Sequence, residues 1–471
     1  MWQRFTDDAR QVMYAAQEEA IRCGGLWVGP EHLLLSIAAS RETRAARLLV
    51  ALGIDLDEMA RDAGAALPNT SGNDGAAGAP SIGANVAAIL DAAAAEAQRM
   101  GSESLGTEHI LVALAERGGE SVVRALRVDA ERLRAGVQAG LATEAAAPRA
   151  DVERARRLVR LDSLRLRGRS LLSMAELDAD QLAGVLDVAE AFAAVRRTSE
   201  RIVAWDRPRC LACLFEKPSL RTRVTFELGM KLMGGEVVIL GPTEIGLGTR
   251  EPVPDAARNL ERWVDVIMAR VMRHETLVGL RDHARVPVIN GLCDREHPCQ
   301  ALADLLTLRQ RFGALDGLRV AWVGDGNNVL HSLLYAAALS GMSLTAACPA
   351  GYEPDQGILM SARKLSRGDA RLEVVREPEA ACAGAHAVVT DVWTSMGQEA
   401  EREERLRRFA GYQVTAALMD RAHEDAVFLH CLPAHRGEEV AADVIDGPRS
   451  AVFDQAENRM YAQQAVLALV L

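Results

Sequence analysis

From about Ser170 to the end of the chain, short apolar runs alternate with longer helical stretches. The first runs are RCLACLF, GGEVVIL and VDVIMAR, and a second set is LRVAWVGDG, MSLTAAC, AHAVVTDVW and AVFLHCL. Such alternation is typical of parallel strands joined by helices. The pattern therefore predicts two α/β lobes with parallel sheets and binding sites at the carboxyl ends of the strands. The stretch SLLSMAELDADQLAGVLDVAEAFAA, which begins at Ser170, predicts a strongly amphipathic helix before the first strand.

An internal repeat precedes this region. RCGGLWVGPEHLLLSIA begins at Arg22 and RMGSESLGTEHILVALA begins at Arg99, so the two copies are offset by 77 residues. Each copy joins an alanine-rich helix to an apolar helix through a glycine turn and a G-[PT]-E-H-[LI]-L phrase. Pro30 and Thr107, each beside an acidic residue, suit a helix start, where free N–H groups favour negative charge. A Gly/Ala/Ser-rich stretch, from about residue 64 to 85, predicts a flexible link between the two helical repeats.

Length and charge limit the classes of protein to consider. The chain has 471 residues, enough for about three compact units. A net charge of −11 argues against sequence-independent binding of nucleic acid. The N-terminal segment is polar, and no apolar run is long enough to span a bilayer. We therefore expect a cytoplasmic protein that binds neither nucleic acid nor membranes.

The cysteines do not indicate a disulfide scaffold, because only eight are spread over this long chain. Cys210 and Cys213 form a C-x-x-C phrase within an apolar run. Residues three apart on a strand point to opposite faces. We therefore expect no metal site at this pair.

A basic connector lies between Arg149 and Arg169, with eight arginines and three acidic residues. Its spacing allows a helix, and we expect a solvated linker helix, although an anionic partner would also suit its charge. The expected organisation is a helical repeat domain (1–142), a basic linker (143–162), a first α/β lobe (163–308), a second lobe (309–453) and a C-terminal helix that packs back on the first lobe (454–471).

The segment FEKPSLRTRVTFE, from Phe215 to Glu227, has the features of an anion site. A strand ends before Pro218, and a turn rich in serine, threonine and arginine then enters a helix. Two hydroxyls and two guanidinium groups therefore meet the free N–H groups of one helix N-terminus. This combination favours a bound anion.

Donors suited to a carbonyl group follow. Arg270 ends an apolar strand, and the phrase His297-Pro298-Cys299-Gln300 opens a helix, so that an imidazole and an amide face one pocket. Donors aimed at a carbonyl oxygen stabilise the negative charge that develops when the carbonyl carbon is attacked.

Four further phrases belong to the second half. VGDGNNVLHSL starts at Val323 and lacks the G-x-G-x-x-G pattern of a dinucleotide loop. DVWTSMGQE starts at Asp391, HCLPAHRGEEV starts at His430, and FDQAENRMYA places Arg459 in a helix near the end of the chain.

Taken together, these motifs resemble the aspartate/ornithine carbamoyltransferase family, over about residues 163 to 471. The resemblance implies transfer of the carbamoyl group of carbamoyl phosphate to L-ornithine, giving L-citrulline, without metal or cofactor and in a homotrimer. It implies that carbamoyl phosphate is bound by Ser219, Leu220, Arg221, Thr222, Arg270, His297, Gln300, Cys431, Leu432 and Arg459. It implies that ornithine is bound by Asn328, Asp391, Ser395 and Met396. The expected catalytic group is Cys431, Asp391, Arg270 and His297, with Cys431 and Asp391 positioning the amine and managing its proton.

One segment departs from the family pattern. Many members have a glutamine in a Q-[IL]-G phrase, whereas TEIGLGTREP has Gly246 at this position. We expect this loop to act through Thr249, Arg250 or backbone groups instead.

The repeat resembles the Clp N-terminal domain, over about residues 1 to 142, through its GPEHLL and GTEHIL phrases. No G-x-x-x-x-G-K-[ST] phrase occurs, so no P-loop ATPase follows it. The resemblance implies binding of peptides, adaptors or a Clp protease component, with phosphoarginine held at Glu31 and Glu108. Two interpretations of these glutamates stay open, since they either cap their helices or bind a ligand.

Two other functions stay open. A sister carbamoyltransferase would use another amine, such as putrescine or an N-acylated ornithine, although the S-M-G phrase argues against it. A binding protein would keep an inactive transferase as a scaffold for the Clp-like domain, although nearly all the expected site residues are present.

Overall fold

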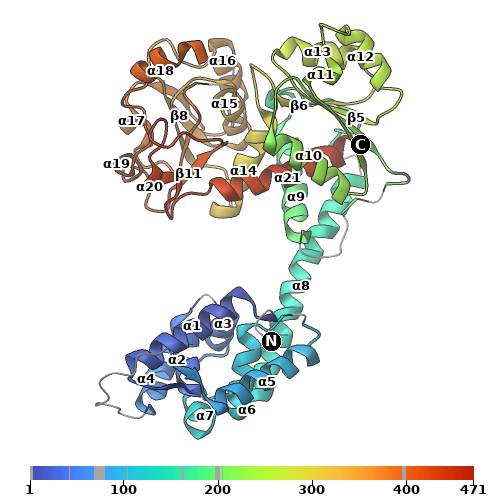
Figure 1. The fold of residues 1–471 in the computed structure, drawn as a ribbon. Coiled ribbons are helices and arrows are strands. Elements are labelled where there is room, and N and C mark those ends of the chain that lie inside the picture. The colour runs from blue at the N-terminus through green and yellow to red at the C-terminus, as the bar shows by residue number, and fades with distance from the viewer. Residues whose placement is uncertain are drawn as a thin grey trace. The chain divides into compact units, whose positions relative to one another are not determined.

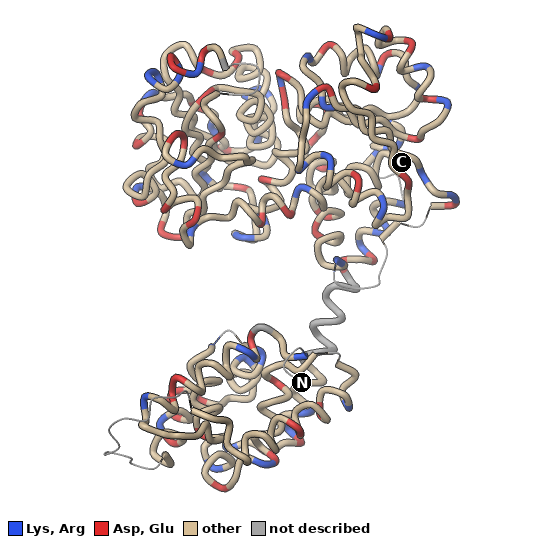
Figure 2. The backbone as a smooth tube through the Cα atoms, in the orientation of Figure 1, with Lys and Arg blue, Asp and Glu red and all other residues tan. Residues whose placement is uncertain are grey.

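The computed structural model describes residues 4–41, 43–67, 80–102, 104–160, 164–196, 202–203, 205–394 and 399–471. The chain forms two compact units, Met1–Ala147 and Pro148–Leu471 (Figure 1). Basic and acidic positions are interspersed along the backbone of both units (Figure 2). Among the described helices, none combines the length and the apolar character that a membrane crossing needs.

The first unit is mainly helical, as the repeat predicts. Its helices are α1 (Asp7–Arg22), α2 (Pro30–Ala39), α3 (Arg44–Ala51), α4 (Leu56–Ala65), α5 (Ala84–Arg99), α6 (Thr107–Arg117), α7 (Glu120–Leu126) and the first part of α8, which begins at Ala130. Helix α5 begins and ends 77 residues after α1, which matches the offset of the repeat. A short parallel pair, β1 (Trp27–Val28) and β2 (Ser81–Ile82), is not predicted by the repeat pattern. Residues 68–79 of the expected flexible link lie outside the described residues.

Helices α2 and α6 begin with the same cap. The Gly29 N–H donates to Nδ1 of His32 at 3.0 Å, and the Gly106 N–H donates to Nδ1 of His109 at 2.9 Å. Burial lowers the pKa of both histidines, so neutral rings accept these bonds. The cap is therefore made by the histidine of the G-[PT]-E-H phrase and leaves the preceding glutamate available for other contacts.

The second unit contains two parallel sheets, as predicted. The strands of the first lobe are β3 (Cys210–Phe215), β4 (Glu236–Leu240), β5 (Val266–Arg270) and β6 (Val288–Leu292), in the order β4-β3-β5-β6. Strand β6 is an addition to the predicted set. Cys213 packs in the core on one face, whereas Cys210 packs with α12 (Val253–Leu260) and α13 (His274–His283) on the other face. The two thiols therefore point apart, as expected.

The sheet of the second lobe has five strands in the order β11-β10-β7-β8-β9. They are β7 (Arg319–Val323), β8 (Ser343–Ala347), β9 (Leu372–Val375), β10 (Ala387–Thr390) and β11 (Val427–His430), all parallel. The unpredicted β9 is an edge strand that is mostly only partly buried, so its sequence lacks a continuous apolar run. Helices α15 (Asn328–Ser340) and α16 (Gln356–Leu365) cover one face, and α17 (Pro378–Cys382), α19 (Ala416–Met419) and α20 (Ala442–Ile445) cover the other.

Helix α8 (Ala130–Arg160) runs through the region expected to be a linker. Val152, Ala155 and Val159 are buried in the core of the second unit, while Arg154 and Arg157 are exposed. The basic connector is therefore helical as far as Arg160, whereas residues 164–169 are not helical. Its helical part is not wholly solvated, because one of its faces contributes to a core.

Two further helices support the first lobe. The expected helix after Ser170 is preceded by a short 3-10 turn, and α9 (Ala179–Val195) begins where the Asp178 carboxylate accepts the Gln181 N–H at 2.8 Å. Most of α9 is buried, so it is less amphipathic than predicted. Helix α21 (Val452–Val470) packs against α9, α10 (Leu220–Leu232) and α14 (Pro298–Phe312). This packing brings Arg459 beside the carboxyl ends of the first sheet.

Candidate active site

The predicted anion turn lies between β3 and α10. Ser219 is the N-cap of α10, and its hydroxyl accepts the Thr222 N–H at 3.3 Å. Thr222 is buried, whereas the Leu220 side chain is 74% exposed. The side chain of Leu220 therefore points away from the turn, and only its backbone can serve an anion there.

Three arginines from different parts of the sequence meet at this turn. Arg270 ends β5 and donates to the Thr222 hydroxyl at 3.4 Å, and Arg459 donates to the same oxygen at 3.1 Å. Arg221 donates to the Leu432 carbonyl of the second lobe. The Nε atoms of Arg270 and Arg459 are buried and have no hydrogen-bond partner within the described part of the chain.

The electrostatics of this cluster favour an anionic ligand. Burial lowers the pKa of Arg221, Arg270 and Arg459. The pKa of Arg270 falls to about 10, mainly through burial and further through the charge of the nearby Arg459. None of the three forms an ion pair with a carboxylate among the described residues. Buried cations without counter-ions are costly, and a bound anion would offset that cost.

His297 and Gln300 open α14 as predicted. His297 is buried, its Nδ1 has no partner in the described structure, and burial and the neighbouring arginines lower its pKa well below the ordinary value. The ring is therefore neutral. The Gln300 carbonyl oxygen accepts from Arg459 at 2.7 Å, so Gln300 orients this arginine.

Asp304 is a buried residue of the site that the sequence analysis missed. Its Oδ1 accepts from the amides of Gln300 at 2.8 Å and Gln455 at 2.6 Å, and Gln455 in turn accepts the His430 N–H at 3.0 Å. Burial raises the pKa of Asp304 to about 6. An acidic residue four positions after Gln300, inside the apolar phrase ALADLLT, was the available signal, since residues i and i+4 share a helix face.

The raised pKa of Asp304 predicts a pH-dependent stability. Because the folded-state pKa of about 6 exceeds the ordinary aspartate value of 3.8, the contribution of this carboxyl to stability is fully present below the unfolded pKa and is lost as the pH rises through 6. Asp304→Asn removes this titration. We therefore expect the melting temperature of the variant relative to wild type to rise between pH 5 and pH 8, equivalent to about 1 kcal/mol. If the difference in melting temperature between the variant and the wild type were the same at both pH values, the raised pKa of Asp304 would be wrong.

Asp391 and Cys431 meet at the carboxyl ends of β10 and β11. The Cys431 thiol donates to Asp391 Oδ1 at 3.0 Å, and the Asn327 amide donates to Asp391 Oδ2 at 2.7 Å. Burial, followed by the Asp391 carboxylate, raises the pKa of Cys431 well above its ordinary value. Cys431 is therefore a thiol that donates a hydrogen bond, a protonation state that its sequence leaves open.

The two neighbouring asparagines, Asn327 and Asn328, have different hydrogen-bond partners. Asn327 caps α15 and contacts Asp391, whereas the Asn328 amide donates to the Cys293 carbonyl at 2.6 Å. Asn327 is therefore a second residue that the sequence analysis missed. The predicted ornithine-site residues Ser395 and Met396 lie outside the described residues.

The segment after β11 holds the two lobes together at the site. Leu432 has a left-handed backbone, with φ of 57°, and its carbonyl accepts from Arg221. Its N–H donates to Nδ1 of His430 at 2.9 Å, and Nε2 of His430 lies 3.2 Å from the Glu439 carboxylate. Asp391, His430 and Cys431 place possible metal-ligand atoms within 4.8 Å of one another. Both nitrogens of His430 and the thiol are already hydrogen-bonded, so we assign the cluster as a hydrogen-bond network.

In the loop TEIGLGTREP, the side chains of Thr249 and Arg250 donate to the backbone of the loop itself. Gly246 has φ of 50°, the Thr249 hydroxyl donates to the Gly246 carbonyl at 3.0 Å, and Arg250 donates to the Glu244 carbonyl at 3.1 Å. Thr249 and Arg250 are exposed. Their expected role in binding therefore stays a prediction.

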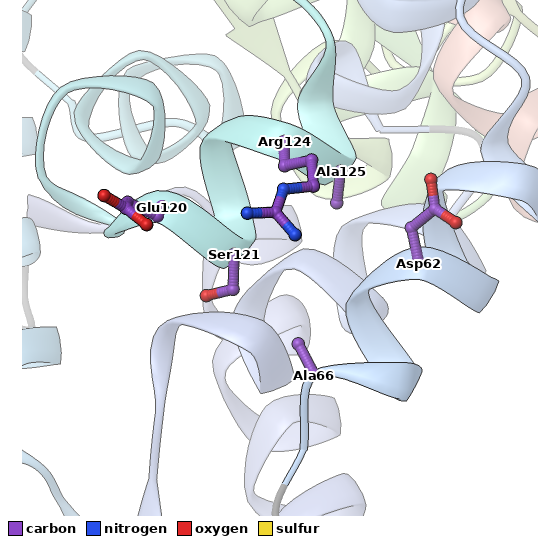
Figure 3. Close-up of a pocket in the computed structure, with 6 residues that line it drawn as sticks. All are labelled: Asp62, Ala66, Glu120, Ser121, Arg124 and Ala125. Carbon is purple, nitrogen blue, oxygen red and sulfur yellow. The ribbon is translucent and has the colours of Figure 1, made fainter.

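In the first unit, the paired glutamates lie in different surroundings. Glu31 accepts from the Ser121 hydroxyl at 2.7 Å, and Glu108 is buried and pairs with Arg44 at 3.2 Å. Ser121 also lines a polar pocket of about 400 Å³, where the Arg124 side chain extends from α7 (Figure 3). The other lining residues are Asp62, Ala66, Glu120 and Ala125.

Known protein families match both units. Residues 169–310 match the aspartate/ornithine carbamoyltransferase carbamoyl-P binding domain, and residues 316–470 match the Asp/Orn binding domain of the same family. An ornithine carbamoyltransferase of Thermus thermophilus is 52% identical over 303 residues, which are 64% of this chain and 97% of that protein. The chain belongs to the aspartate/ornithine carbamoyltransferase family. Residues 4–129 match the Clp repeat N-terminal domain.

Other members of the family show the same extent of similarity. An ornithine carbamoyltransferase of Carboxydothermus hydrogenoformans is 50% identical over 65% of this chain and 98% of that protein. The solved ornithine carbamoyltransferase of Pyrococcus furiosus has a TM-score of 0.63 and 45% identity, over 65% of this chain and 97% of that chain. These family members match only the transferase part, so the repeat domain is an addition to it.

Proposed function

We propose that the second unit transfers the carbamoyl group of carbamoyl phosphate to L-ornithine, forming L-citrulline and phosphate. The observation that carries this proposal is the juxtaposition of two half-sites. On one side lie three arginines without carboxylate partners among the described residues, the buried Arg459 and the half-buried Arg221 and Arg270. The Asp391–Cys431 pair lies on the other side, and Arg221 joins Leu432 between them.

The arginine half-site suits carbamoyl phosphate. Arg221 and the N-terminus of α10, with Ser219 and Thr222, would hold the phosphate through charge-assisted hydrogen bonds. Arg270 and the neutral His297 would donate to the carbamoyl oxygen, which becomes negative when the carbon is attacked. Gln300, oriented by Asp304, would hold Arg459 in place beside them.

The Asp391 half-site suits the amine. The ornithine side-chain nitrogen must be neutral to attack the carbamoyl carbon, and deprotonating an amine of pKa near 10.4 costs about 4–5 kcal/mol at pH 7. Asp391 and the Cys431 thiol would orient the amine so that its lone pair faces the carbon. The nitrogen–carbon bond then forms, the bond to the phosphate oxygen breaks, and the amine proton leaves through this pair.

An amine assay of the purified full chain tests the substrate. With saturating carbamoyl phosphate, we expect citrulline formation from ornithine and little turnover with putrescine, N-acetylornithine or aspartate. The identity to relatives named ornithine carbamoyltransferase, about 50%, supports ornithine over the acylated form, because the solved N-acetyl-L-ornithine transcarbamylase is 29% identical. Turnover with only another amine would favour a sister enzyme, and no turnover with any amine would favour the inactive scaffold.

We further propose a homotrimer assembled through α10. Four apolar side chains at four-residue spacing form an exposed stripe on this helix: Leu220, Val224, Leu228 and Leu232, which are 74%, 47%, 43% and 52% exposed. Such a stripe is typical of an interface. It begins directly after Ser219, so a second copy packed there would border the anion turn.

Leu228→Asp is expected to weaken this assembly. A charge in the stripe would have to be buried against apolar side chains, while wild-type burial of the leucine contributes about 1.5–3 kcal/mol. Sedimentation analysis should show a shift from trimer to smaller species. Met360→Asp on α16, at an apolar residue that is also exposed, is the control that should stay a trimer. An unchanged sedimentation profile for Leu228→Asp would argue against the interface.

For the first unit, we propose binding of peptides or adaptors of the Clp type, with phosphoarginine as the ligand to test. Glu31 lies beside the pocket and contacts Ser121, whereas Glu108 is buried and already paired with Arg44. Titration of the full chain with a phosphoarginine peptide, with Glu31 and Glu108 intact and replaced by glutamine, tests this. No binding by the wild type would remove phosphoarginine from the candidates.

A further inference from the structure

Helix α18 (Arg402–Arg408) has one buried residue within it, and that residue is an arginine. Arg405 is 6% exposed, where an apolar side chain would be the ordinary choice for the inner face of a surface helix. The other arginines of this helix, such as Arg408, are exposed. A buried guanidinium requires polar partners, and these partners indicate its role.

Two of the partners of Arg405 lie on separate loops, the loop after β7 and the loop after β10. Its Nη1 donates to the Asp325 carboxylate at 2.9 Å and to the Trp393 carbonyl at 3.0 Å, and its Nε donates to Glu401 at 2.9 Å. The guanidinium also lies 5.0 Å from the centre of the Tyr352 ring. One nitrogen therefore ties the loop after β7 to the loop after β10.

Both loops belong to the proposed amino-acid half-site. Asp325 lies two residues before Asn327, and Trp393 lies two residues after Asp391. Asn327 and Asp391 are joined by a hydrogen bond of 2.7 Å. Arg405 therefore connects the same two loops a second time, through residues next to the site.

The aromatic residues around Arg405 strengthen this arrangement. Trp393 stacks on Phe409 with ring centres 5.7 Å apart, and Phe409 lies 4.8 Å from Tyr352 in an edge arrangement. The Tyr352 carbonyl accepts the Gly326 N–H at 2.8 Å. Each loop is thus held through its backbone as well as its side chains, which limits the freedom of Asp391 to move relative to Asn327.

Stability alone does not account for a buried ion pair of this kind. The cost of desolvating Asp325 and Arg405 offsets much of their attraction, and apolar replacements of such pairs are often neutral in stability. Apolar side chains cannot form the hydrogen bonds by which Arg405 connects two separate loops.

We propose that Arg405 is a positioning residue for the amino-acid substrate, which acts by holding the Asp391 loop and the Asn327 loop in register. The inference rests on the proposed carbamoyl transfer to ornithine. It implies that Arg405 and Asp325 affect the binding and turnover of ornithine but not the binding of carbamoyl phosphate.

The test compares Arg405→Met, Asp325→Asn and the double variant in the full chain. We expect each single variant to raise KM for ornithine by about 10- to 100-fold, as small misplacements of reacting groups do, while the Kd for carbamoyl phosphate, measured by titration calorimetry, changes less than about twofold. The double variant should resemble the worse single variant, because two residues that act as one unit are not additive. Arg408→Met removes an exposed arginine of the same helix and should behave as wild type.

Several outcomes would overturn the inference. These are an unchanged KM for ornithine in Arg405→Met, equal losses in ornithine and carbamoyl phosphate binding, and strictly additive effects in the double variant. If Arg405→Met does not fold, Asp325→Asn and Arg405→Lys take its place, and recovery of the wild-type KM by lysine, which lacks the forked geometry, would contradict the two-loop role. Absence of ornithine turnover in the wild type would instead reject the proposed function.

Discussion

Arg221→Ala is expected to lower kcat/KM for carbamoyl phosphate by about 10²- to 10³-fold, the usual loss for one preorganised donor to a developing charge. Among the described residues Arg221 donates to a neutral carbonyl and pairs with no carboxylate, so its charge is available to a ligand. Burial lowers its pKa, which means that the charge is partly removed from water, and an anion would stabilise it. The variant also removes the bond to the Leu432 carbonyl, through which the two half-sites meet. Steady-state rates with each substrate varied in turn measure this effect.

Arg258→Ala is a matched control for Arg221→Ala, because Arg258 is an exposed arginine on α12 whose pair with Asp255 is at the surface. It should keep wild-type rates, since exposed pairs contribute little. If Arg221→Ala were as active as the control, the assignment of this turn as the phosphate site would be wrong.

Asp391→Asn is expected to lower kcat with ornithine by about 10²- to 10³-fold, in the range of a lost group that manages a proton. The carboxylate accepts from both Cys431 and Asn327, and an amide in its place would turn one N–H toward another donor. The amine would lose its negative partner at the same time. Carbamoyl phosphate binding should change little, because the arginine half-site is untouched.

Asp420→Asn controls for the change of charge. Asp420 is 72% exposed in its side chain and pairs with Arg449 at the surface. Wild-type rates are expected for this variant. If Asp391→Asn lowered the affinity for carbamoyl phosphate as much as it lowered kcat, the assignment of Asp391 to the amine half-site would be wrong.

Local sequence predicted the parts of the site that are built from neighbouring residues. Ser219 and Thr222 lie on one turn, and His297 and Gln300 open one helix, so a phrase of a few residues specifies their geometry. Asp304 and Asn327 were not predicted, because their roles depend on partners far away in the sequence. Gln455 lies about 150 residues after Asp304, and Asp391 lies about 60 residues after Asn327. No short phrase records such a contact.

The secondary structure shows the same division. Strands with continuous apolar runs, such as β3 and β7, were predicted because both of their faces are buried. Strand β9 lies at the edge of its sheet and is mostly only partly buried, and α9 starts at the Asp178 cap rather than where its apolar pattern begins. Val152 and Val159 of α8 are buried in the core of the second unit. Helical periodicity alone does not specify the core in which such residues pack.

The sequence alone determined the α/β lobes, the double repeat and the Ser/Thr/Arg-rich turn that begins α10, because apolar periodicity and helix-start chemistry act over a few residues. Only the tertiary structure decided that Arg221, Arg270 and Arg459 converge without counter-ions, and that Cys431 is a protonated donor to Asp391. The protonation state follows from burial and from a neighbouring charge, and both arise only after the strands β10 and β11 lie side by side.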